Sequence, residues 1–398
     1  MRLTMPSFRG DAPAPRVLYV APSAELYGSD LALERMAKAH LTRGGRAVVL
    51  LPRAGPLAPR LRAAHVDVRI VPLAVLQRRL MNPGGVMHIS ADLLRSLRPV
   101  LATARELKPD LLHSNTSSVV SGAAAARVLR LPHVWTLRED LRMRGGGVPA
   151  RLLRLGADQV IAVSGSTRDQ LLRRCPGLSS RVTVVRDGVD VERFANLPPR
   201  EQACGRLGID PGRPVIGMLA RIKANKGQTL LVEAVRRIET ARETVQLVFA
   251  GDVVPGEEYE LTRLEDAIRS AGMTGRVTLP GFVTDPTDLL AACHIVAAPS
   301  IAAESFGLAA VDGLSAGKPV VASAIGGHLE IVRDGIDGFL VRPGDVDALA
   351  AALDRLLGDA LLRRRLGEAA FRDRARFSAE HGHQAVWRVY DEVLNRRR

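Results

Sequence analysis

The segment from residue 294 to residue 327 constrains the fold of this 398-residue chain more than any other, and it reads HIVAAPSIAAESFGLAAVDGLSAGKPVVASAIGG. Residues 295–298 are a short apolar run closed by a proline and a serine, as expected of a buried strand followed by a turn. A helix is predicted over about residues 306–316, ended at Gly317, and residues 320–323 are predicted to be the next strand. Strand, loop, helix and strand in this order predict the crossover unit of a parallel sheet.

The junction between the loop and the helix is a candidate phosphate site. The first N–H groups of a helix have no partner within it and carry the positive end of its dipole. Gly307 has no side chain to keep a ligand away, so a phosphate could bind the amides of Phe306, Gly307 and Leu308. Glu304 precedes this point and Asp312 lies about one turn beyond it, so their carboxylates could bind hydroxyls on either side. A nucleoside diphosphate sugar has this layout of ribose, two phosphates and sugar.

These residues resemble the donor-binding motif of the retaining glycosyltransferases of family 4, in which a Phe-Gly-Leu lies between two glutamates and an AxGxPVVAS…GG stretch follows. The matching positions are Glu304, Phe306, Gly307, Leu308, Gly317, Pro319, Val320, Val321, Ala322, Ser323, Gly326 and Gly327. Asp312 replaces the second glutamate and is one methylene shorter, so its contact with the ribose would run through water or be lost. Taken singly, Glu304 could be a solvated loop carboxylate, Asp312 a surface residue and Gly307 a plain turn.

Further positions in the second half of the chain resemble the same family. Arg221 and Lys226 match its GRLxxxKG loop, although Ala220 stands where a glycine is common. Two cations at a strand end suit a diphosphate leaving group, because arginine can bind it through two hydrogen bonds and lysine as a point charge. A solvated basic loop is the alternative. In relatives the backbone after a later strand, here residues 277–280, reads the base, which makes Val283 a candidate contact.

The first half of the chain resembles the family more loosely. Residues 16–51 predict one strand–helix–strand unit, with Gly28 and Ser29 at the mouth of the helix. These two residues resemble the family's short glycine loop, which lies against the donor phosphates and the acceptor. A helix N-cap formed by Ser29 or Asp30 explains them equally well.

Arg138 and Glu139 follow the strand predicted from His133, at the carboxyl edge where open parallel sheets bind ligands. Many relatives carry His-Asp here and a subgroup carries Arg-Glu, so the resemblance implies that Arg138 and Glu139 position the sugar or the acceptor hydroxyl. A buried ion pair between the two is the alternative. His113, at the end of another predicted strand, could be a ligand, but a packed histidine is the more common case.

The length of the chain predicts two domains rather than one. The resemblance implies an α/β protein of GT-B type, with two Rossmann-like domains facing a central cleft and a C-terminal helix that returns to the first domain. The expected divisions are a disordered leader, an acceptor-side domain, a Pro-rich linker, a nucleotide-sugar-binding domain and the returning helix, at residues 1–15, 16–195, 196–214, 215–375 and 376–398.

Composition narrows the classes of function. Three cysteines form neither a metal-binding spacing nor a disulfide framework, as in a reducing cytoplasm, and no apolar run predicts a membrane span. The net charge is +14, but the arginines are scattered among alanines and leucines and aromatic residues make up only 4%, so nucleic-acid binding is not expected. An anionic donor, or an anionic membrane surface that carries the acceptor, accounts better for the charge. We therefore expect a cytoplasmic protein with a candidate peripheral contact at the inner face of the membrane.

The expected function is transfer of a hexosyl group from a nucleotide diphosphate sugar to a glycan, lipid or small-molecule acceptor, with retention at the anomeric carbon. The resemblance implies no metal and no cofactor besides the donor, since the basic loop and the helix mouth would stabilise the departing diphosphate. Front-face attack is favoured, in which the leaving phosphate takes the acceptor's proton and Glu304 or Glu139 assists. A GT-B sugar-nucleotide epimerase and a non-catalytic nucleotide-sugar-binding protein are the alternatives, and Asp312 is the best argument for the latter.

Overall fold

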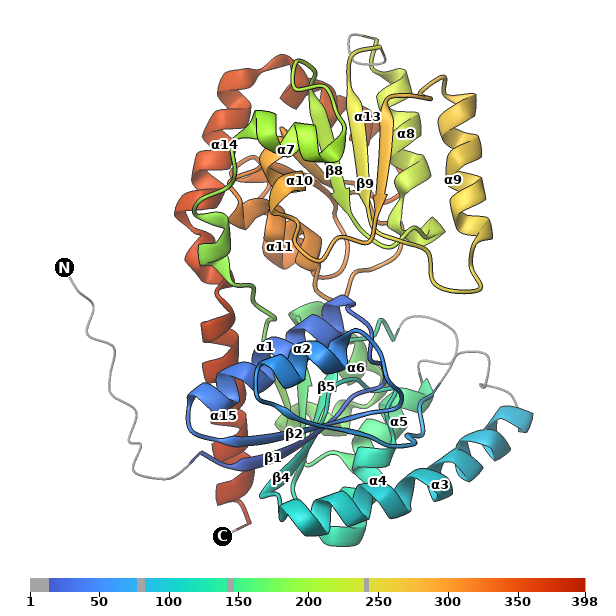
Figure 1. Ribbon diagram of the computed structural model, residues 1–398, viewed down its shortest axis with the longest axis vertical. Helices are drawn as coiled ribbons and strands as arrows, with labels where there is room; N and C mark the ends of the chain where they lie inside the picture. Colours follow the sequence, from blue (N-terminus) through green and yellow to red (C-terminus); the bar gives the residue numbers. More distant parts are fainter. Residues whose placement is uncertain (1–13, 77–82, 142–146, 240–242, 398) are drawn as a thin grey trace, which may run out of the picture. The chain divides into compact units, whose positions relative to one another are not determined.

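The computed structural model describes residues 14–76, 83–141, 147–239 and 243–397. Most of the expected leader, residues 1–13, lies outside this part. Contacts divide the chain into two compact units (Figure 1). The first unit comprises residues 1–163, 167–185 and 383–398, and the second comprises residues 164–166 and 186–382. Each unit contains one parallel sheet, so each is described by itself.

The first unit contains a seven-stranded sheet of order β3-β2-β1-β4-β5-β6-β7, in which all neighbours are parallel. Its strands are β1 (Arg16–Val20), β2 (Arg46–Leu51), β3 (Asp67–Ile70), β4 (Leu111–Ser114), β5 (His133–Leu137), β6 (Gln159–Ala162) and β7 (Val182–Val184). Its helices are α1 (Gly28–Thr42), α2 (Leu57–Ala63), α3 (Pro83–Leu107), α4 (Ser121–Leu129), α5 (Gly147–Gly156), α6 (Gly165–Arg174) and, from the end of the chain, α15 (Ala379–Asn395).

Helices cover both faces of this sheet. Val17 and Tyr19 of β1 pack in a cluster with residues of α1, α2 and α15, whereas their neighbours Leu18 and Val20 pack with residues of α3 and α4. Successive side chains of a strand point to opposite faces, so a strand buried on both faces is a continuous apolar run. This is why the apolar segments of the sequence correctly predicted strands.

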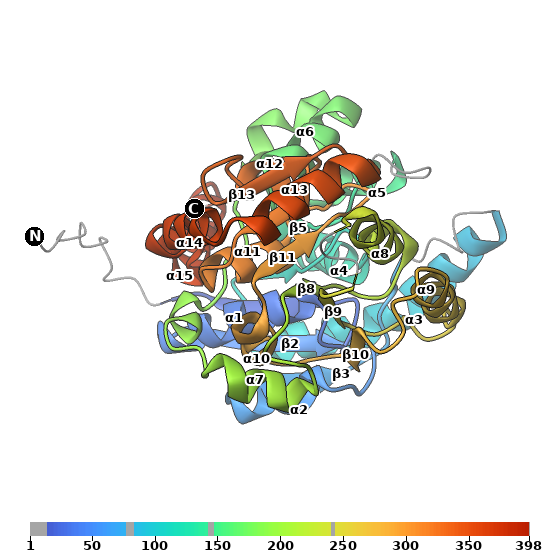
Figure 2. The ribbon, with the colours of Figure 1, turned by 90° about the horizontal axis from the view of Figure 1, so that it is seen from above.

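The second unit contains a six-stranded parallel sheet of order β10-β9-β8-β11-β12-β13. Its strands are β8 (Val215–Leu219), β9 (Gln246–Ala250), β10 (Val277–Gly281), β11 (Ile295–Ala298), β12 (Val320–Ser323) and β13 (Gly338–Val341). Its helices are α7 (Arg200–Leu207), α8 (Gln228–Arg237), α9 (Tyr259–Ser270), α10 (Thr287–Ala292), α11 (Leu308–Ser315), α12 (His328–Ile331), α13 (Val346–Gly358) and α14 (Ala360–Arg372). Helices α8 and α9 cover one face and α7 and α10 the other (Figures 1 and 2). Two α/β units of this kind confirm the predicted Rossmann-like architecture.

The structure corrects one detail of the expected organisation. The stretch 196–214 is not a simple linker, because it contains α7, which packs on α10 inside the second unit. Helix α3 runs through Pro99, although a proline removes one helical hydrogen bond. Arg95, four residues earlier, is exposed, so water can bind the carbonyl that loses its donor.

A buried polar cluster fixes α15 to the sheet of the first unit. The hydroxyl of Tyr390 lies 2.5 Å from Nδ1 of His113 and 3.3 Å from the hydroxyl of Tyr19. The other ring nitrogen of His113 lies 2.7 Å from Oγ1 of Thr136. Burial, assisted by the charge of Arg138, lowers the pKa of His113 to about 3, so the ring is neutral near pH 7. His113 is therefore the packed histidine that the sequence analysis considered more common.

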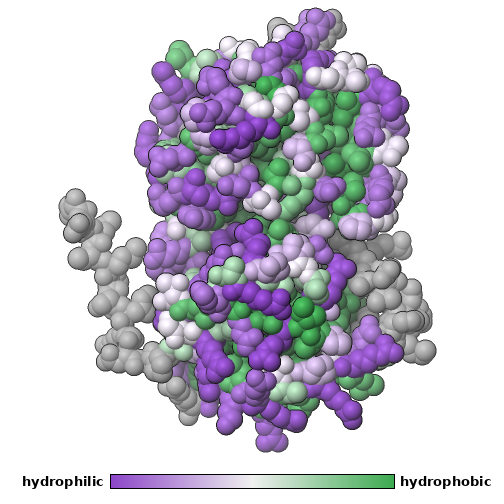
Figure 3. All heavy atoms as spheres, viewed as in Figure 1, coloured by the Kyte–Doolittle hydropathy of each residue, from purple (hydrophilic) through white to green (hydrophobic). Residues whose placement is uncertain are grey.

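Figure 3 shows hydrophilic side chains over most of the face that it presents, with apolar side chains between them. Within the described ranges, no helix combines the length and the apolar character needed to cross a membrane.

Candidate functional site

Helix α11 begins at the loop that the sequence marked as a phosphate site. Gly307 is its N-cap and has φ 113° and ψ 52°, in the left-handed region that favours glycine. A Cβ at this position would lie 2.7 Å from Cδ2 of His328, so the close packing also requires a glycine. In the described part of the chain, the amides of Phe306, Gly307 and Leu308 donate no hydrogen bond to protein. They can therefore donate to an anion.

Glu304 lies beside these amides and is held by two partners. Nζ of Lys226 lies 2.5 Å from Oε1 of Glu304, and Oγ of Ser300 donates to the same oxygen at 2.7 Å. Burial raises the pKa of Glu304, but Lys226, His328 and the two hydrogen bonds outweigh it and lower the pKa to about 2. Glu304 is therefore an anion at neutral pH, and its Oε2 remains able to accept a hydrogen bond from a hydroxyl.

Gly326 and Gly327, the two glycines after β12, let the chain there pass directly against the backbone of residues 304–306. A Cβ on Gly327 would lie 2.0 Å from the carbonyl oxygen of Phe306, and the amide of Gly327 donates to the carbonyl of Glu304 at 2.8 Å. His328 follows, with Nδ1 3.2 Å from the carbonyl of Ser323. Burial lowers the pKa of His328, and its ring packs directly against Gly307.

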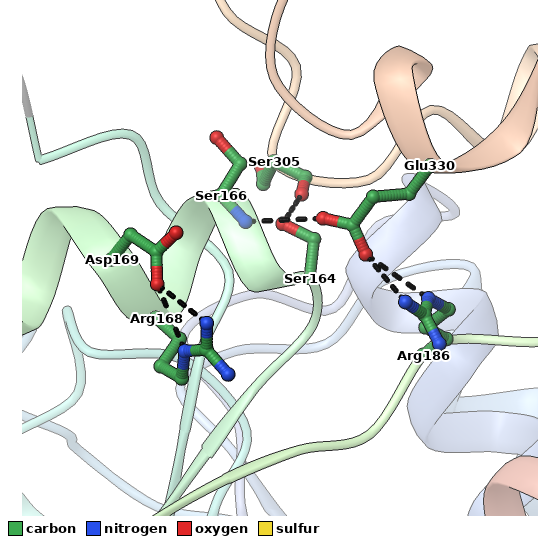
Figure 4. A network of polar contacts seen from close by, with 7 residues as sticks. All are labelled: Ser164, Ser166, Arg168, Asp169, Arg186, Ser305 and Glu330. Carbon is green, nitrogen blue, oxygen red and sulfur yellow. Dashed lines mark hydrogen bonds and ion pairs between the residues drawn. The ribbon is translucent and has the colours of Figure 1, made fainter. Parts of the chain in front are cut away.

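A second set of polar contacts supports the same loop (Figure 4). Oγ of Ser164 donates to the carbonyl of Ser305 at 2.6 Å. Glu330, on α12, accepts from the amide of Ser166 at 3.0 Å and from the guanidinium of Arg186 at 2.8 and 3.1 Å. All these residues belong to the second unit. The backbone before Phe306 is thus held by side-chain hydrogen bonds as well as by α11.

The remaining predicted donor contacts also belong to the second unit, on the segments after β8 and β10 and on α11. Arg221 follows β8, is exposed, and accepts a hydrogen bond at its carbonyl from Gln228 at 2.8 Å. Val283 follows β10 and packs, partly buried, on the cluster that contains α7 and α10. Asp312 is half-buried on α11. Within the described residues, no group of three or more His, Cys, Asp or Glu side chains is placed to hold a metal ion.

The first unit places Gly28 and Ser29 in the first turn of α1. The N-cap is Tyr27, not Ser29 or Asp30, so the capping alternative is corrected. The buried carboxylate of Asp30 instead accepts from the amide of Tyr27 at 3.2 Å and from Oγ of Ser23 at 2.6 Å. The carbonyl of Ser29 accepts from Nδ2 of Asn115 at 2.9 Å. The glycine turn is therefore fixed from both sides by side chains.

Arg138 and Glu139 lie at the carboxyl end of β5, as predicted. Oε2 of Glu139 accepts from Oγ of Ser117 at 2.7 Å and from the amides of Ser117 and Arg138 at 3.2 and 3.0 Å. Nε of Arg138 donates to the carbonyl of Asn115 at 3.1 Å. Glu139 thus anchors the loop after β4 through one oxygen, and both side chains are half-buried at this edge.

Two residues of the donor-side cluster were not predicted. Ser300 was interpreted only as the end of a strand, and His328 received no role. The one sequence signal for them was their position, because Ser300 ends the turn after β11 and His328 follows the two glycines after β12. A sequence pattern does not show that both side chains turn towards Glu304 and Gly307.

Two Rossmann-like units, with a basic loop and a free helix N-terminus at the carboxyl edge of the second sheet, define the GT-B class of glycosyltransferase. The chain matches the family model "Glycosyl transferases group 1" over residues 200–373 and the model "Glycosyltransferase Family 4" over residues 28–193. This chain belongs to glycosyltransferase family 4, as the resemblance predicted.

Curated relatives and solved structures agree with this assignment. The chain is 30% identical to a D-inositol 3-phosphate glycosyltransferase of Xylanimonas cellulosilytica over 427 residues, which covers 99% of both proteins. It is 32% identical to an alpha-maltose-1-phosphate synthase of Mycobacterium tuberculosis over 306 residues, 71% of this chain and 76% of the relative. Alr3699/HepE of Anabaena, solved in complex with UDP-glucose, is 26% identical with a TM-score of 0.83, covering 95% of this chain and 100% of that one. WaaG, a glycosyltransferase involved in lipopolysaccharide biosynthesis, is 15% identical and shares the fold with a TM-score of 0.72 over 94% of this chain and 99% of that one.

Proposed function

We propose that this glycosyltransferase is a retaining, metal-independent hexosyltransferase that uses a UDP-sugar as donor and a hydroxyl of a glycan, lipid or small molecule as acceptor. The UDP-glucose complex of Alr3699/HepE supports the choice of donor. The observation that carries the proposal is the ionised Glu304, paired with Lys226, beside the unbonded amides of Phe306 to Leu308.

Each group of the donor site has a role in this proposal. The amides of residues 306–308 and the cations Arg221 and Lys226 bind the diphosphate, whose charge grows as it departs. Oε2 of Glu304 accepts a hydrogen bond from a hydroxyl of the sugar. Asp312 faces the ribose, and the backbone at Val283 faces the base. The helix N-terminus and two cations supply the positive charge that a leaving diphosphate needs, and this supports a reaction without a metal.

In the proposed reaction the acceptor oxygen attacks the anomeric carbon from the face that the diphosphate leaves. The new bond joins the acceptor oxygen to the anomeric carbon, and the bond from that carbon to the phosphate oxygen breaks with its electron pair on the phosphate. The proton of the acceptor hydroxyl moves to the departing phosphate. The products are the glycosylated acceptor, with unchanged anomeric configuration, and UDP. Arg138 and Glu139 position the acceptor or the sugar in this scheme.

A binding screen followed by product analysis tests the proposal. UDP-sugars are expected to raise the melting temperature of the protein more than GDP- or ADP-sugars. Glu304→Ala should abolish both this stabilisation and sugar transfer, and Lys226→Ala should abolish sugar transfer. Lys223→Ala should retain both, because Lys223 is paired with Glu257 instead. An inverted product, or a donor epimerised without any acceptor, would refute the retaining transferase. Full transfer by Glu304→Ala would refute the assigned site.

A further inference from the structure

A concave site lies in the first unit, at the edge of the sheet opposite to Arg138 and Glu139. It is a cavity of about 390 Å³ at the amino ends of β5 and β6, where α4, α5 and α15 end. Its lining includes His133, Leu155 and Asp158. It also includes four arginines: Arg127, Arg130, Arg181 and Arg397. We call this site the basic pocket. No predicted site residue belongs to it.

The lining of the basic pocket is strongly positive. Asp158 is its one carboxylate, and Arg397 neutralises it through contacts of 2.9 and 3.1 Å. Burial lowers the pKa of His133 to about 4, so this ring adds no charge at neutral pH. The exposed side chains of Arg127 and Arg130 form no hydrogen bond or ion pair with any described residue. Two guanidinium groups are therefore available to an anion.

The other two arginines are held in place by the ends of the helices. Arg181 donates to the carbonyls of Ala157 and Arg154 at 3.0 and 3.2 Å, and Arg397 donates to the carbonyl of Arg130 at 2.6 Å. These contacts satisfy backbone groups that a helix end leaves without partners. They also fix the positions of two guanidinium groups at the cavity, of which that of Arg397 is paired with Asp158.

The backbone at Arg130 is a second, independent observation. Arg130 ends α4 with φ 55° and ψ 33°, the left-handed conformation in which a glycine usually ends a helix. A residue with a Cβ is uncommon in this region, which His65 and Lys108 also adopt in the described part of the chain. The chain keeps an arginine where a glycine would fold more easily, and that arginine lines the basic pocket.

Most of the pocket residues come from an arginine-rich part of the sequence. Residues 121–181 contain 11 arginines, no lysine and 4 acidic residues, which accounts for half of the net charge of +14. Two apolar side chains are exposed near the cavity, Leu155 at 67% and Val128 at 54%. The region thus combines fixed guanidinium groups with an apolar rim.

We propose that the basic pocket binds a phosphate-bearing anion, with Arg127 and Arg130 as its direct contacts. Guanidinium groups bind phosphate oxygens through paired, charge-assisted hydrogen bonds, and the volume suits a small ligand. The phosphate can belong to a soluble polyphosphate or to the headgroup of an anionic lipid, for which Leu155 and Val128 would contact the acyl region. The site is separate from the donor-binding residues, all of which lie in the second unit.

Calorimetric titration with sodium pyrophosphate tests the pocket in the full-length protein. The background carries Arg221→Ala and Lys226→Ala, which removes both cations of the donor site and leaves the unpaired charge of Glu304 to repel the probe. We expect one binding event that weakens as salt is added. Adding Arg127→Ala and Arg130→Gly should weaken it at least about tenfold. The glycine relieves the left-handed strain at position 130, so the melting temperature should not fall and unfolding cannot explain the loss.

A matched control removes the same charge elsewhere on the first unit. Arg98→Ala with Arg105→Ala, both exposed on α3, should leave pyrophosphate binding unchanged. Flotation with vesicles of phosphatidylcholine, with or without phosphatidylglycerol, separates the two sources of phosphate. Binding of pyrophosphate alone identifies a soluble ligand, and flotation that needs both phosphatidylglycerol and the two pocket arginines identifies a lipid headgroup. The proposal is overturned if neither probe binds, or if binding survives in the Arg127→Ala, Arg130→Gly protein.

Discussion

Replacing Lys226 by methionine should destabilise the second unit, because it leaves Glu304 without its cation. Methionine keeps most of the apolar stem of lysine and removes only the charge and the hydrogen bond of 2.5 Å to Oε1. The carboxylate would then retain its burial, which raises its pKa, and lose the largest of the effects that lower it. Removing one partner of a buried ion pair costs far more folding free energy than replacing both partners by apolar groups.

The magnitude follows from the pKa of Glu304. A fall from the ordinary 4.5 to about 2 corresponds to about 3 kcal/mol of unfolding free energy at neutral pH, at about 1.4 kcal/mol per unit. The side chains of Lys226 and Glu304 are 21% and 19% exposed, so solvent screens the pair only in part. Because the folded-state pKa is lowered, this stability is present above pH 4.5 and is lost as the pH falls from about 4.5 towards about 2. For a unit of this size, about 3 kcal/mol is about 6–12 °C in melting temperature.

Calorimetric melting of wild type and Lys226→Met at several pH values measures the effect. The difference in melting temperature should be greatest near pH 7 and should shrink towards pH 4, since protonation of Glu304 removes the unpaired charge. Lys223→Met is the matched control, because the pair of Lys223 with Glu257 has side chains that are both 30% exposed and should contribute less than about 1 kcal/mol. Adding Glu304→Gln to Lys226→Met should restore most of the loss. Equal losses in the two lysine variants, or a loss that does not change with pH, would refute the reasoning.

Three further changes address the fold and the donor site. Gly307→Ala should lower the melting temperature and weaken UDP binding, measured by titration, because φ is 113° and the new Cβ would lie 2.7 Å from His328; retained affinity would contradict the assigned helix mouth. Tyr390→Phe should cost about 1–3 kcal/mol in unfolding free energy, because His113 loses a buried hydrogen-bond partner, and a melting temperature equal to wild type would contradict this. Asp312→Glu should lower the KM for the donor with little change in kcat if the shorter side chain leaves the ribose contact incomplete, and an unchanged KM would contradict that explanation.

The sequence predicted the donor-side unit most completely, and the reason is physical. A buried parallel strand must be apolar along its whole length, and a helix that follows must begin and end with residues of special backbone geometry. Ile295–Ala298, Gly307 and Gly317 carry both signals, so the strand, the helix mouth and the helix end were identified. The resemblance to the family's GRLxxxKG loop then assigned Arg221 and Lys226 to the donor site without any knowledge of contacts.

The elements that the sequence analysis missed lack such local signals. Helix α7 follows a proline-rich segment, and only its packing on α10 makes it part of the second unit rather than a linker. The N-cap at Tyr27 has no capping side chain of the usual kind, since Asp30 makes the hydrogen bond from inside the helix. Ser300 and His328 join the donor-side cluster because the turn after β11 and the paired glycines bring them there. Tertiary contacts decide all these cases, and no residue spacing reveals them.

The pairing of Lys226 with Glu304 affects which groups of the donor site bind the donor and which stabilise the departing diphosphate. Because the pair is neutral as a whole, the attraction of this site for an anion rests on the free amides of residues 306–308 and on Arg221. A departing diphosphate gains charge, so Lys226 can then interact with it more strongly than with the bound donor. Lys226→Met should therefore lower kcat more than it raises the KM for the donor, whereas Arg221→Ala should act mainly on that KM. The opposite pattern would mean that Lys226 binds the ground state and that Glu304 is simply its counter-ion.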